Sequence, residues 1–387
     1  MTDALLQEVA ARYGTPTYVY DLDAISARVA DLQAAFPGAL VRYAVKANAN
    51  GAILRHLAGL GIGAEALTEG ELERTLRAGF DPATIILGGP GHTAALAARA
   101  AAVGVGLVSL DSEGAYAIWS SVQAPQTRFV VRLNPGFDPH THEHLATAAA
   151  TSKFGETLQA TRAIAARLYE AGKLAGFHVH AGSMLDDQSV AGLVVAALEP
   201  LYQEFVGLEL VDLGGGFAVP HPPLHAFAET YAAFAARHGV KIVLEPGRFI
   251  VADAGTLLTR VLHVKESGRR HVIADAGMAD LLRPALYGAH HPIRLVGEAP
   301  QAARALPTDV DGPLCENADR LGQDVGLPAV QQGDLLAVGR AGAYGFAMAS
   351  NYVSHLRGAE VTVAAGEAKL ARRREEPADL WRLELDP

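Results

Sequence analysis

The chain has 387 residues, half of them hydrophobic, which is enough for two cores of ordinary domain size. Its net charge of −10, with no basic run before residues 372–374, argues against nucleic acid as a partner. The single cysteine, Cys315, excludes an intrachain disulfide and favours a cytoplasmic protein. No apolar run reaches the ~20 residues that span a bilayer, so no membrane partner is expected.

Residues 17–20 form a short apolar run that predicts a strand ahead of the main repeat. Eight further candidate strands then alternate with helical segments such as 51–60, 69–78, 157–171 and 224–238. The strands are 41–47, 62–67, 84–88, 106–110, 129–133, 177–181, 208–213 and 241–245. This alternation predicts a parallel sheet. Eight strands, and no Gly-x-Gly-x-x-Gly turn after the first, favour a closed (β/α)8 barrel over a doubly wound open sheet, the competing fold.

The pattern changes after about Asp253, where long Ala-rich helices stop and short strands take over. The candidate strands there are 256–264, 271–274, 334–338 and 360–364. We therefore predict an α/β protein with two domains. A TIM-type (β/α)8 barrel covers 22–253, and a C-terminal β-sandwich or β-barrel domain combines 1–21 with 254–387.

Reactive residues gather where the predicted strands end, the edge at which such barrels place their active sites. In chain order they are Lys46, Glu65, Gly88, Gly89, Asp111, Asn134, His180, Gly214, Gly215, Gly216 and Glu245. A lysine, carboxylates, a histidine and a glycine cluster on one face indicate a catalytic pocket more strongly than any one of them alone.

Lys46 ends the first predicted strand of the barrel. A lysine in a barrel mouth is partly desolvated, which lowers its pKa and suits it to act as a Schiff-base nucleophile. The alternative is a strand-end lysine that simply faces water. The other reactive residues predicted at the strand ends favour the interpretation of Lys46 as a nucleophile.

The glycine triplet 214–216 follows the seventh predicted strand. Three glycines let backbone N–H groups approach an anion, and this loop is a favoured phosphate site in barrels. A tight strand-to-helix turn is the alternative interpretation.

His178 and His180 alternate on one predicted strand and therefore point the same way. A metal pair is conceivable, but no further ligands stand at matching spacing, so we expect no metal. His180 suits a position in which its flat imidazole lies beside a cofactor ring. For His178 we expect only a hydrogen-bonded histidine of the core.

Glu245 and Arg248 follow the eighth strand. The carboxylate could pair with a pyridinium nitrogen and strengthen a cofactor as an electron sink, and Arg248 could bind a carboxylate or phosphate. A structural Glu–Arg pair is the alternative. In the last third, glycine-rich turns could present Cys315, Glu316 and Tyr344.

These motifs together resemble the fold-type III pyridoxal-phosphate decarboxylases, the alanine-racemase-like barrel family, and within it the diaminopimelate decarboxylases. The resemblance covers nearly the whole chain. The matching segments are 43–48, 141–155, 178–183, 214–216, 245–248, 283–287, 315–316 and Tyr344.

The resemblance implies the decarboxylation of meso-2,6-diaminopimelate to L-lysine and CO2 by a homodimer with shared active sites. It implies cofactor contacts for Lys46, Glu65, His180, Ser183, Gly214, Gly215, Gly216, Glu245, Gly247, Arg248 and Tyr344. It implies substrate contacts for Arg248, Arg283, Tyr287, Glu316 and Tyr344, with Lys46, His180 and Cys315 as catalytic residues. Cys315 or Lys46 would return the proton to the α-carbon.

Several positions depart from the family pattern: Ala181, Met184, Asn317 and the stretch around His355. The last two bear on the substrate, so a decarboxylase of ornithine, lysine or a derivative stays the alternative. An amino-acid racemase uses the same barrel but usually places arginine, where this chain has Glu245, at the ring nitrogen. A small cofactor-carrier protein on a lone barrel would lack residues 256–387.

Overall fold

The computed structural model describes residues 1–136, 152–297 and 306–385. The chain divides into two compact units. Met1–Ile25 and Val251–Pro387 form one, here called the β unit, and Ser26–Ile250 form the other, the barrel unit. The sequence predicts a barrel domain over residues 22–253, beside the unit Ser26–Ile250 found here. Most of the family-like segment 141–155 lies outside the described residues.

The barrel unit contains a closed barrel of eight parallel strands, which confirms the predicted fold class. The strands are β2 (Leu40–Ala44), β3 (Gly63–Ala66), β4 (Ile85–Leu87), β5 (Leu107–Leu110), β6 (Arg128–Arg132), β7 (Leu174–His178), β8 (Leu210–Asp212) and β9 (Lys241–Leu244). The first and last strands close the ring, with Leu40 opposite Val243. Parallel strands buried on both faces are mostly apolar, which is why the sequence displays them as largely hydrophobic runs.

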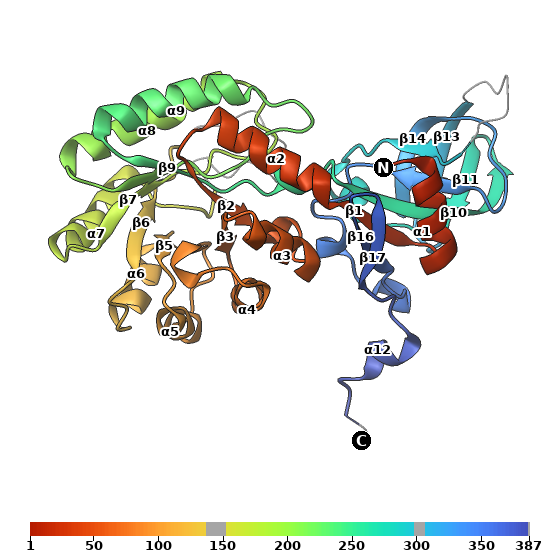
Figure 1. Ribbon diagram of the computed structural model, residues 1–387, viewed down its shortest axis with the longest axis horizontal. Helices are drawn as coiled ribbons and strands as arrows, with labels where there is room; N and C mark the ends of the chain where they lie inside the picture. Colours follow the sequence, from red (N-terminus) through yellow and green to blue (C-terminus); the bar gives the residue numbers. More distant parts are fainter. Residues whose placement is uncertain (137–151, 298–305, 386–387) are drawn as a thin grey trace. The chain divides into compact units, whose positions relative to one another are not determined.

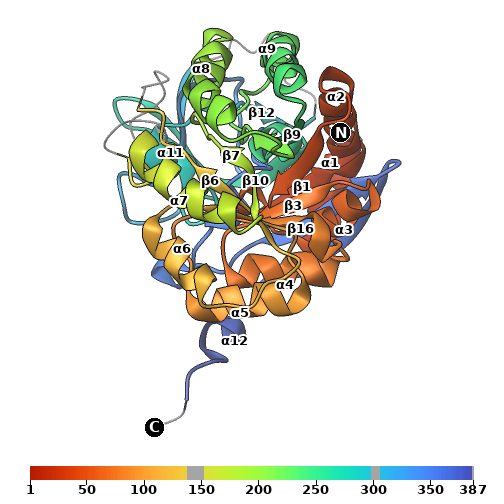
Figure 2. The same ribbon diagram turned by 90° about the vertical axis from the view of Figure 1, so that its left-hand side faces the viewer.

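Helices surround these strands (Figure 2). They are α3 (Gly51–Gly59), α4 (Glu69–Ala78), α5 (Ala94–Val103), α6 (Glu113–Ser120), α7 (Leu158–Glu170), α8 (Ser189–Glu204) and α9 (Leu224–His238), with the short η2 (Pro82–Thr84) and α10 (Arg248–Val251). Their ends follow local chemistry: the Thr68 side chain caps α4 by accepting from the Glu71 N–H, and Gly79 ends it in the left-handed conformation. α2 (Leu22–Ala35) crosses the boundary between the units.

Two strands end three residues earlier than the sequence predicts, and both changes affect functional residues. β2 ends at Ala44, so Lys46 lies in the 3-10 turn η1 (Val45–Ala47). β7 ends at His178, so His180 lies in the loop beyond it, and the prediction that both histidines alternate on one strand is wrong. Gly182, at φ 148°, turns the chain there in a region that only glycine enters readily.

The β unit is built on a nine-stranded mixed sheet. Its strands are β1 (Thr17–Asp21), β10 (Gly255–Glu266), β11 (Arg270–Ala274), β12 (Ile293–Leu295), β13 (Leu306–Asp311), β14 (Arg320–Leu327), β15 (Leu335–Val338), β16 (Ala359–Ala364) and β17 (Glu367–Arg372). β1 pairs with β10 and β16, which confirms that the predicted strand at 17–20 joins the C-terminal sheet.

Helix α1 (Asp3–Tyr13) packs against this sheet (Figure 1). Its residues Leu6, Val9 and Ala10 form one buried cluster with Leu258 and Val361. The shorter elements of the unit are α11 (Arg283–Tyr287), η4 (Phe346–Met348), η5 (Tyr352–Ser354) and α12 (Pro377–Trp381). Across the described ranges, no helix combines the length and apolar character needed to cross a membrane.

Candidate active site

Lys46 and Glu65 meet at the carboxyl ends of the first two barrel strands. Lys46 Nζ lies 3.4 Å from each carboxylate oxygen of Glu65. The lysine side chain is 36% exposed, while that of Glu65 is only 4% exposed. The buried carboxylate gives the lysine an ion-pair partner at the strand ends. The pair holds the amine at the barrel mouth.

A second ion pair lies inside the barrel. Arg132, the last residue of β6, approaches Asp111 with Nη1 3.4 Å from Oδ2, and both residues are buried. The guanidinium also lies over the ring of Phe154, 4.9 Å from its centroid. Sequence reasoning missed Arg132, although an arginine closing a buried strand is an unusual position that could have signalled it.

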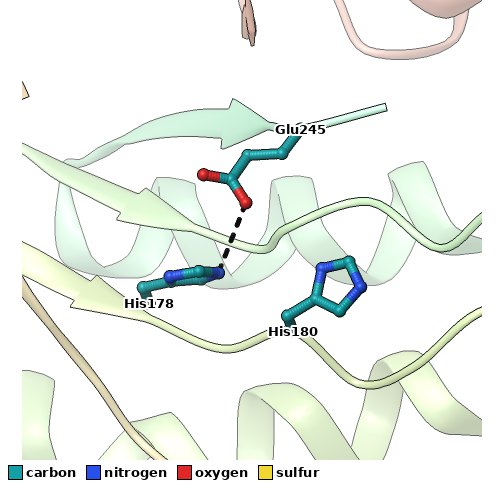
Figure 3. Close-up of side chains that lie close together, drawn as sticks. All are labelled: His178, His180 and Glu245. Atoms are coloured by element: carbon teal, nitrogen blue, oxygen red, sulfur yellow. Dashed lines mark ion pairs between the residues drawn. The ribbon is translucent and has the colours of Figure 1, made fainter. Parts of the chain in front are cut away.

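Glu245 follows β9 and points toward His178 across the barrel (Figure 3). Its Oε2 lies 3.5 Å from His178 Nε2, and both side chains are almost fully buried. The other ring nitrogen of His178, Nδ1, lies 2.8 Å from the hydroxyl of Ser109 on β5. Burial, followed by the charge of Arg132, lowers the pKa of His178 well below its usual value, so the imidazole is neutral.

His180 lies beside this pair in the loop after β7 (Figure 3). The N–H of Gly215 donates to its Nδ1 at 3.2 Å. His178, His180 and Glu245 offer ligand atoms that all lie within 4.8 Å of one another, a donor set that a metal ion could use. Glu245 is far from the histidines in sequence, so this third donor does not show in the local spacing, and the absence of a metal stays a prediction.

Asp212, which ends β8, couples the glycine loop to Glu245. Its Oδ1 accepts the N–H of Gly214 at 2.9 Å, and the residue is fully buried. Burial raises the pKa of Asp212 to about 7, although the hydrogen bond from the Gly214 N–H lowers it. Burial, and next the charge of Asp212, raise the pKa of Glu245 well above its usual value. Both shifts favour the protonated forms of these acids in the protein without its cofactor.

This coupling predicts a pH-dependent stability. Asp212 titrates near 3.8 when unfolded and near 7 when folded, so its stabilising contribution is complete below the lower value and is lost as pH rises to the higher one. The thermal midpoint of the apoprotein should fall between about pH 4 and about pH 8, and Asp212→Asn should reduce that fall. Calorimetry over this range tests it, with exposed Asp186→Asn as the control. An unchanged pH slope in Asp212→Asn would contradict it.

The glycine triplet 214–216 forms a tight loop against the neighbouring strand ends. A Cβ added to Gly215 would lie 2.3 Å from the carbonyl oxygen of Glu245, and one added to Gly216 would lie 2.2 Å from that of Gly182. Only glycine fits at these approaches. Next to Gly182, the Ser183 hydroxyl accepts from Arg248 Nη2 at 3.2 Å, so an arginine and a hydroxyl stand beside the loop.

The barrel unit matches a known family of enzymes. Residues 22–252 match the pyridoxal binding domain of the pyridoxal-dependent decarboxylases. The diaminopimelate decarboxylase of Deinococcus radiodurans is 40% identical over 98% of both chains. That of Pseudomonas aeruginosa is 40% identical over 97% of this chain and 94% of its own. The crystal structure of the Helicobacter pylori enzyme complexed with L-lysine superposes with a TM-score of 0.91, at 33% identity, covering 98% of this chain and 99% of the other.

The chain belongs to the diaminopimelate decarboxylase family of pyridoxal-dependent decarboxylases. Its cofactor is pyridoxal phosphate. The barrel mouth fits this cofactor on its own chemistry. A glycine cradle with Ser183 and Arg248 suits a phosphate, a buried carboxylate at Glu245 suits a ring nitrogen, and Lys46 is the amine beside them. Gly247 packs against the lysine turn, since a Cβ there would lie 2.9 Å from that of Ala47.

The remaining residues that the family resemblance implies belong to the β unit. Arg283 and Tyr287 lie on α11, where Arg283 Nη1 is 3.2 Å from His291 Nε2. Tyr344 adopts a left-handed conformation at φ 57°, in a tight turn.

Cys315 and Glu316 are exposed on a loop that the buried Asp319 holds in place. The N–H of Leu314 donates to the Asp319 carboxylate at 2.6 Å. Glu316 Oε2 accepts the Tyr352 hydroxyl at 2.8 Å. The barrel unit thus gathers the expected cofactor residues other than Tyr344, and the β unit carries the other expected groups.

Two of the departures from the family pattern have structural counterparts. Met184 has φ 62°, an unusual conformation for a residue with a side chain, directly after Ser183. His355 Nε2 lies 3.0 Å from the Asp280 carboxylate, and this hydrogen bond raises the pKa of the imidazole. Ala181 is buried and Asn317 is exposed, and no contact of either explains its departure.

Proposed function

We propose that this chain decarboxylates meso-2,6-diaminopimelate to L-lysine and CO2, the last step of lysine biosynthesis. The observation that carries the proposal is the full-length likeness to diaminopimelate decarboxylases, joined to a barrel mouth with a lysine, a phosphate cradle and a ring-nitrogen carboxylate. Related structures from Helicobacter pylori and M. jannaschii hold L-lysine, the product of this reaction.

Each barrel residue has a role in this proposal. When bound, pyridoxal phosphate supplies an electron sink for the charge left at the α-carbon as CO2 departs. Lys46 would attach the cofactor covalently, with Glu65 beside its amine. His180 would stack on the ring. Ser183, Arg248 and the glycine loop would hold the phosphate, with Gly247 beside it. Tyr344 stays an expected cofactor contact. Glu245 would accept a hydrogen bond from the protonated ring nitrogen, and its charge would keep that proton on the nitrogen.

The substrate's far end needs its own partners, because it carries an ammonium and a carboxylate. Arg283, Tyr287 and Arg248 suit the carboxylate through charge-assisted hydrogen bonds, and Glu316 suits the ammonium. An amino acid without the distal carboxylate would leave arginine charge unpaired in the closed site, which costs several kcal/mol. This is the physical basis of selectivity against lysine and ornithine.

Assembly and proton return complete the proposal. A homodimer with shared active sites accounts for the exposed position of Cys315 and Glu316, which would face a neighbouring subunit. Cys315 or Lys46 returns the proton to the α-carbon. The single cysteine fits the reducing cytoplasm, where this reaction would occur.

A product assay with a panel of amino acids tests the substrate. By mass spectrometry, kcat/KM for meso-diaminopimelate should exceed that for lysine or ornithine by about 10⁴-fold, because polar groups of the site stay unpaired with the shorter molecules. Arg283→Ala should lower kcat/KM for diaminopimelate about 10²-fold. Arg294→Ala, which removes an exposed arginine paired with Asp3 in the same unit, is the control. A higher kcat/KM for lysine would refute the assignment.

A further inference from the structure

The proposed mechanism uses Glu245 but leaves two buried neighbours, His178 and Ser109, without a role. Ser109 lies on β5, His178 ends β7 and Glu245 follows β9, so the three come from alternate strands of the barrel. Side chains from alternate strands share a layer of a barrel interior. Ser109 Oγ is 2.8 Å from His178 Nδ1, and His178 Nε2 is 3.5 Å from Glu245 Oε2, as Figure 3 shows for the second contact.

The Ser109 hydroxyl can donate to Nδ1 of His178 or accept from it, so the direction of this contact is tied to which ring nitrogen carries the proton. A neutral imidazole has one N–H and one acceptor nitrogen, and the partner of one nitrogen sets the state of the other. If the Ser109 hydroxyl donates to Nδ1, the proton of His178 is on Nε2 and faces the Glu245 carboxylate. The opposite tautomer would aim a lone pair at an anion, which is unfavourable once Glu245 is ionised against a ring-nitrogen proton.

We propose that His178, held in its Nε2–H tautomer by Ser109, is a positioning residue that donates to Glu245 Oε2 and leaves Oε1 to face the cofactor's ring nitrogen. The inference rests on the proposed role of Glu245. It adds that the orientation and ionisation of this carboxylate depend on a neutral donor behind it.

His178 differs from an ordinary core histidine because its buried Nε2 faces Glu245 without a normal hydrogen bond. His178 is 4% exposed, and its Nε2 has no hydrogen-bond partner within normal distance in the described residues other than the longer contact to Glu245. A buried ring nitrogen left unsatisfied costs about 1–3 kcal/mol. A contact of 3.5 Å is the kind that tightens when the partner becomes charged and fixed in the loaded enzyme. The histidine is thus aimed at the one carboxylate whose charge the chemistry needs.

Two substitutions at the same position test the donor itself. His178→Gln keeps an N–H₂ group that can reach Glu245, whereas His178→Phe keeps the ring volume and removes the donor. His178→Phe should weaken pyridoxal-phosphate affinity of the apoprotein and lower kcat, each about 10- to 100-fold, the usual effect of losing an outer partner of a site ligand. KM for the amino acid should change little. His178→Gln should recover most of both losses.

His238→Gln is the matched control, because His238 contacts Glu199 at 3.3 Å in a similar pair at the end of α9. It should bind the cofactor like the wild type. Thermal unfolding of each apoprotein accounts for packing effects. If Gln and Phe variants lose affinity and kcat equally, in proportion to lost stability, His178 is a packing residue and the proposal is overturned.

The tautomer gives a readout that does not depend on catalysis or on folding of the His178 variants. In holoenzyme with ¹⁵N-labelled histidine, the His178 signals should show a protonated Nε2 and an unprotonated Nδ1. Ser109→Ala should leave a mixture of tautomers and a smaller loss of cofactor affinity than His178→Phe. A protonated Nδ1 in the wild type would overturn the proposal. Failure of the substrate assignment would instead appear as no lysine formed by a wild-type enzyme whose tautomer is as expected.

Discussion

Lys46→Ala protein is expected to lose covalent attachment of the cofactor and at least about 10³-fold in turnover, because the proposal makes this residue the amine nucleophile and one of the two candidate proton donors. The lysine lies at the barrel mouth beside the buried Glu65, whose carboxylate fixes its direction. Pyridoxal phosphate should still bind the variant noncovalently, since the glycine loop, Ser183 and Arg248 are unaltered.

Borohydride reduction followed by peptide mapping measures this directly. In the wild type, the reduced cofactor should be found on the peptide that contains Lys46 and on no other. Lys241→Ala, which changes a lysine at the start of β9 and therefore at the opposite end of the barrel, should label normally. A labelled peptide in the Lys46→Ala protein at some other lysine would show that the anchor has been assigned to the wrong residue.

The barrel was predictable because its signals are local. Each strand is an apolar run with a helix behind it, so eight repeats can be counted without knowing any long-range contact. The local sequence predicts less of the β unit. Its patterns do not indicate strands β12, β13, β14 and β17 or helix α1. In its sheet, β1 pairs with β16, which lies more than 300 residues further along the chain. β11 pairs in parallel with β13. No pattern in a single segment records such partners.

The residues of the candidate site also separate into those that local sequence signals indicate and those that they do not. Lys46, Glu65, the glycine loop and Glu245 were found because strand ends of a parallel barrel meet on one face. Ser109, Arg132 and Asp212 were missed because they sit within or at the last residue of strands, where a polar residue between apolar ones reads as surface alternation. All three are buried, and each contacts another polar group of the site. Whether a polar strand residue faces the barrel interior depends on its partners from other strands, which a single segment does not show.

Glu245→Gln is expected to separate catalysis from stability. The amide keeps the size of the side chain but cannot hold a positive charge on the ring nitrogen, so kcat should fall about 10²- to 10³-fold, the usual cost of one preorganised electrostatic partner. The cofactor should remain bound, because the proposed phosphate contacts come from the glycine loop, Ser183 and Arg248, which the substitution leaves unchanged. Spectroscopic titration of the variant with pyridoxal phosphate, beside kcat, measures both quantities.

Stability should move in the opposite direction from activity. In the apoprotein, Glu245 is a buried acid whose pKa is raised by burial and by the neighbouring charge of Asp212. Its ionisation at high pH therefore costs stability, which a neutral amide does not incur. Above neutral pH the thermal midpoint of apo Glu245→Gln should equal or exceed that of the wild type while turnover is severely reduced. A holoenzyme with unchanged kcat would mean that Glu245 serves only the packing of the barrel. A variant that loses stability and cofactor together would mean that the carboxylate holds the glycine loop rather than the ring nitrogen.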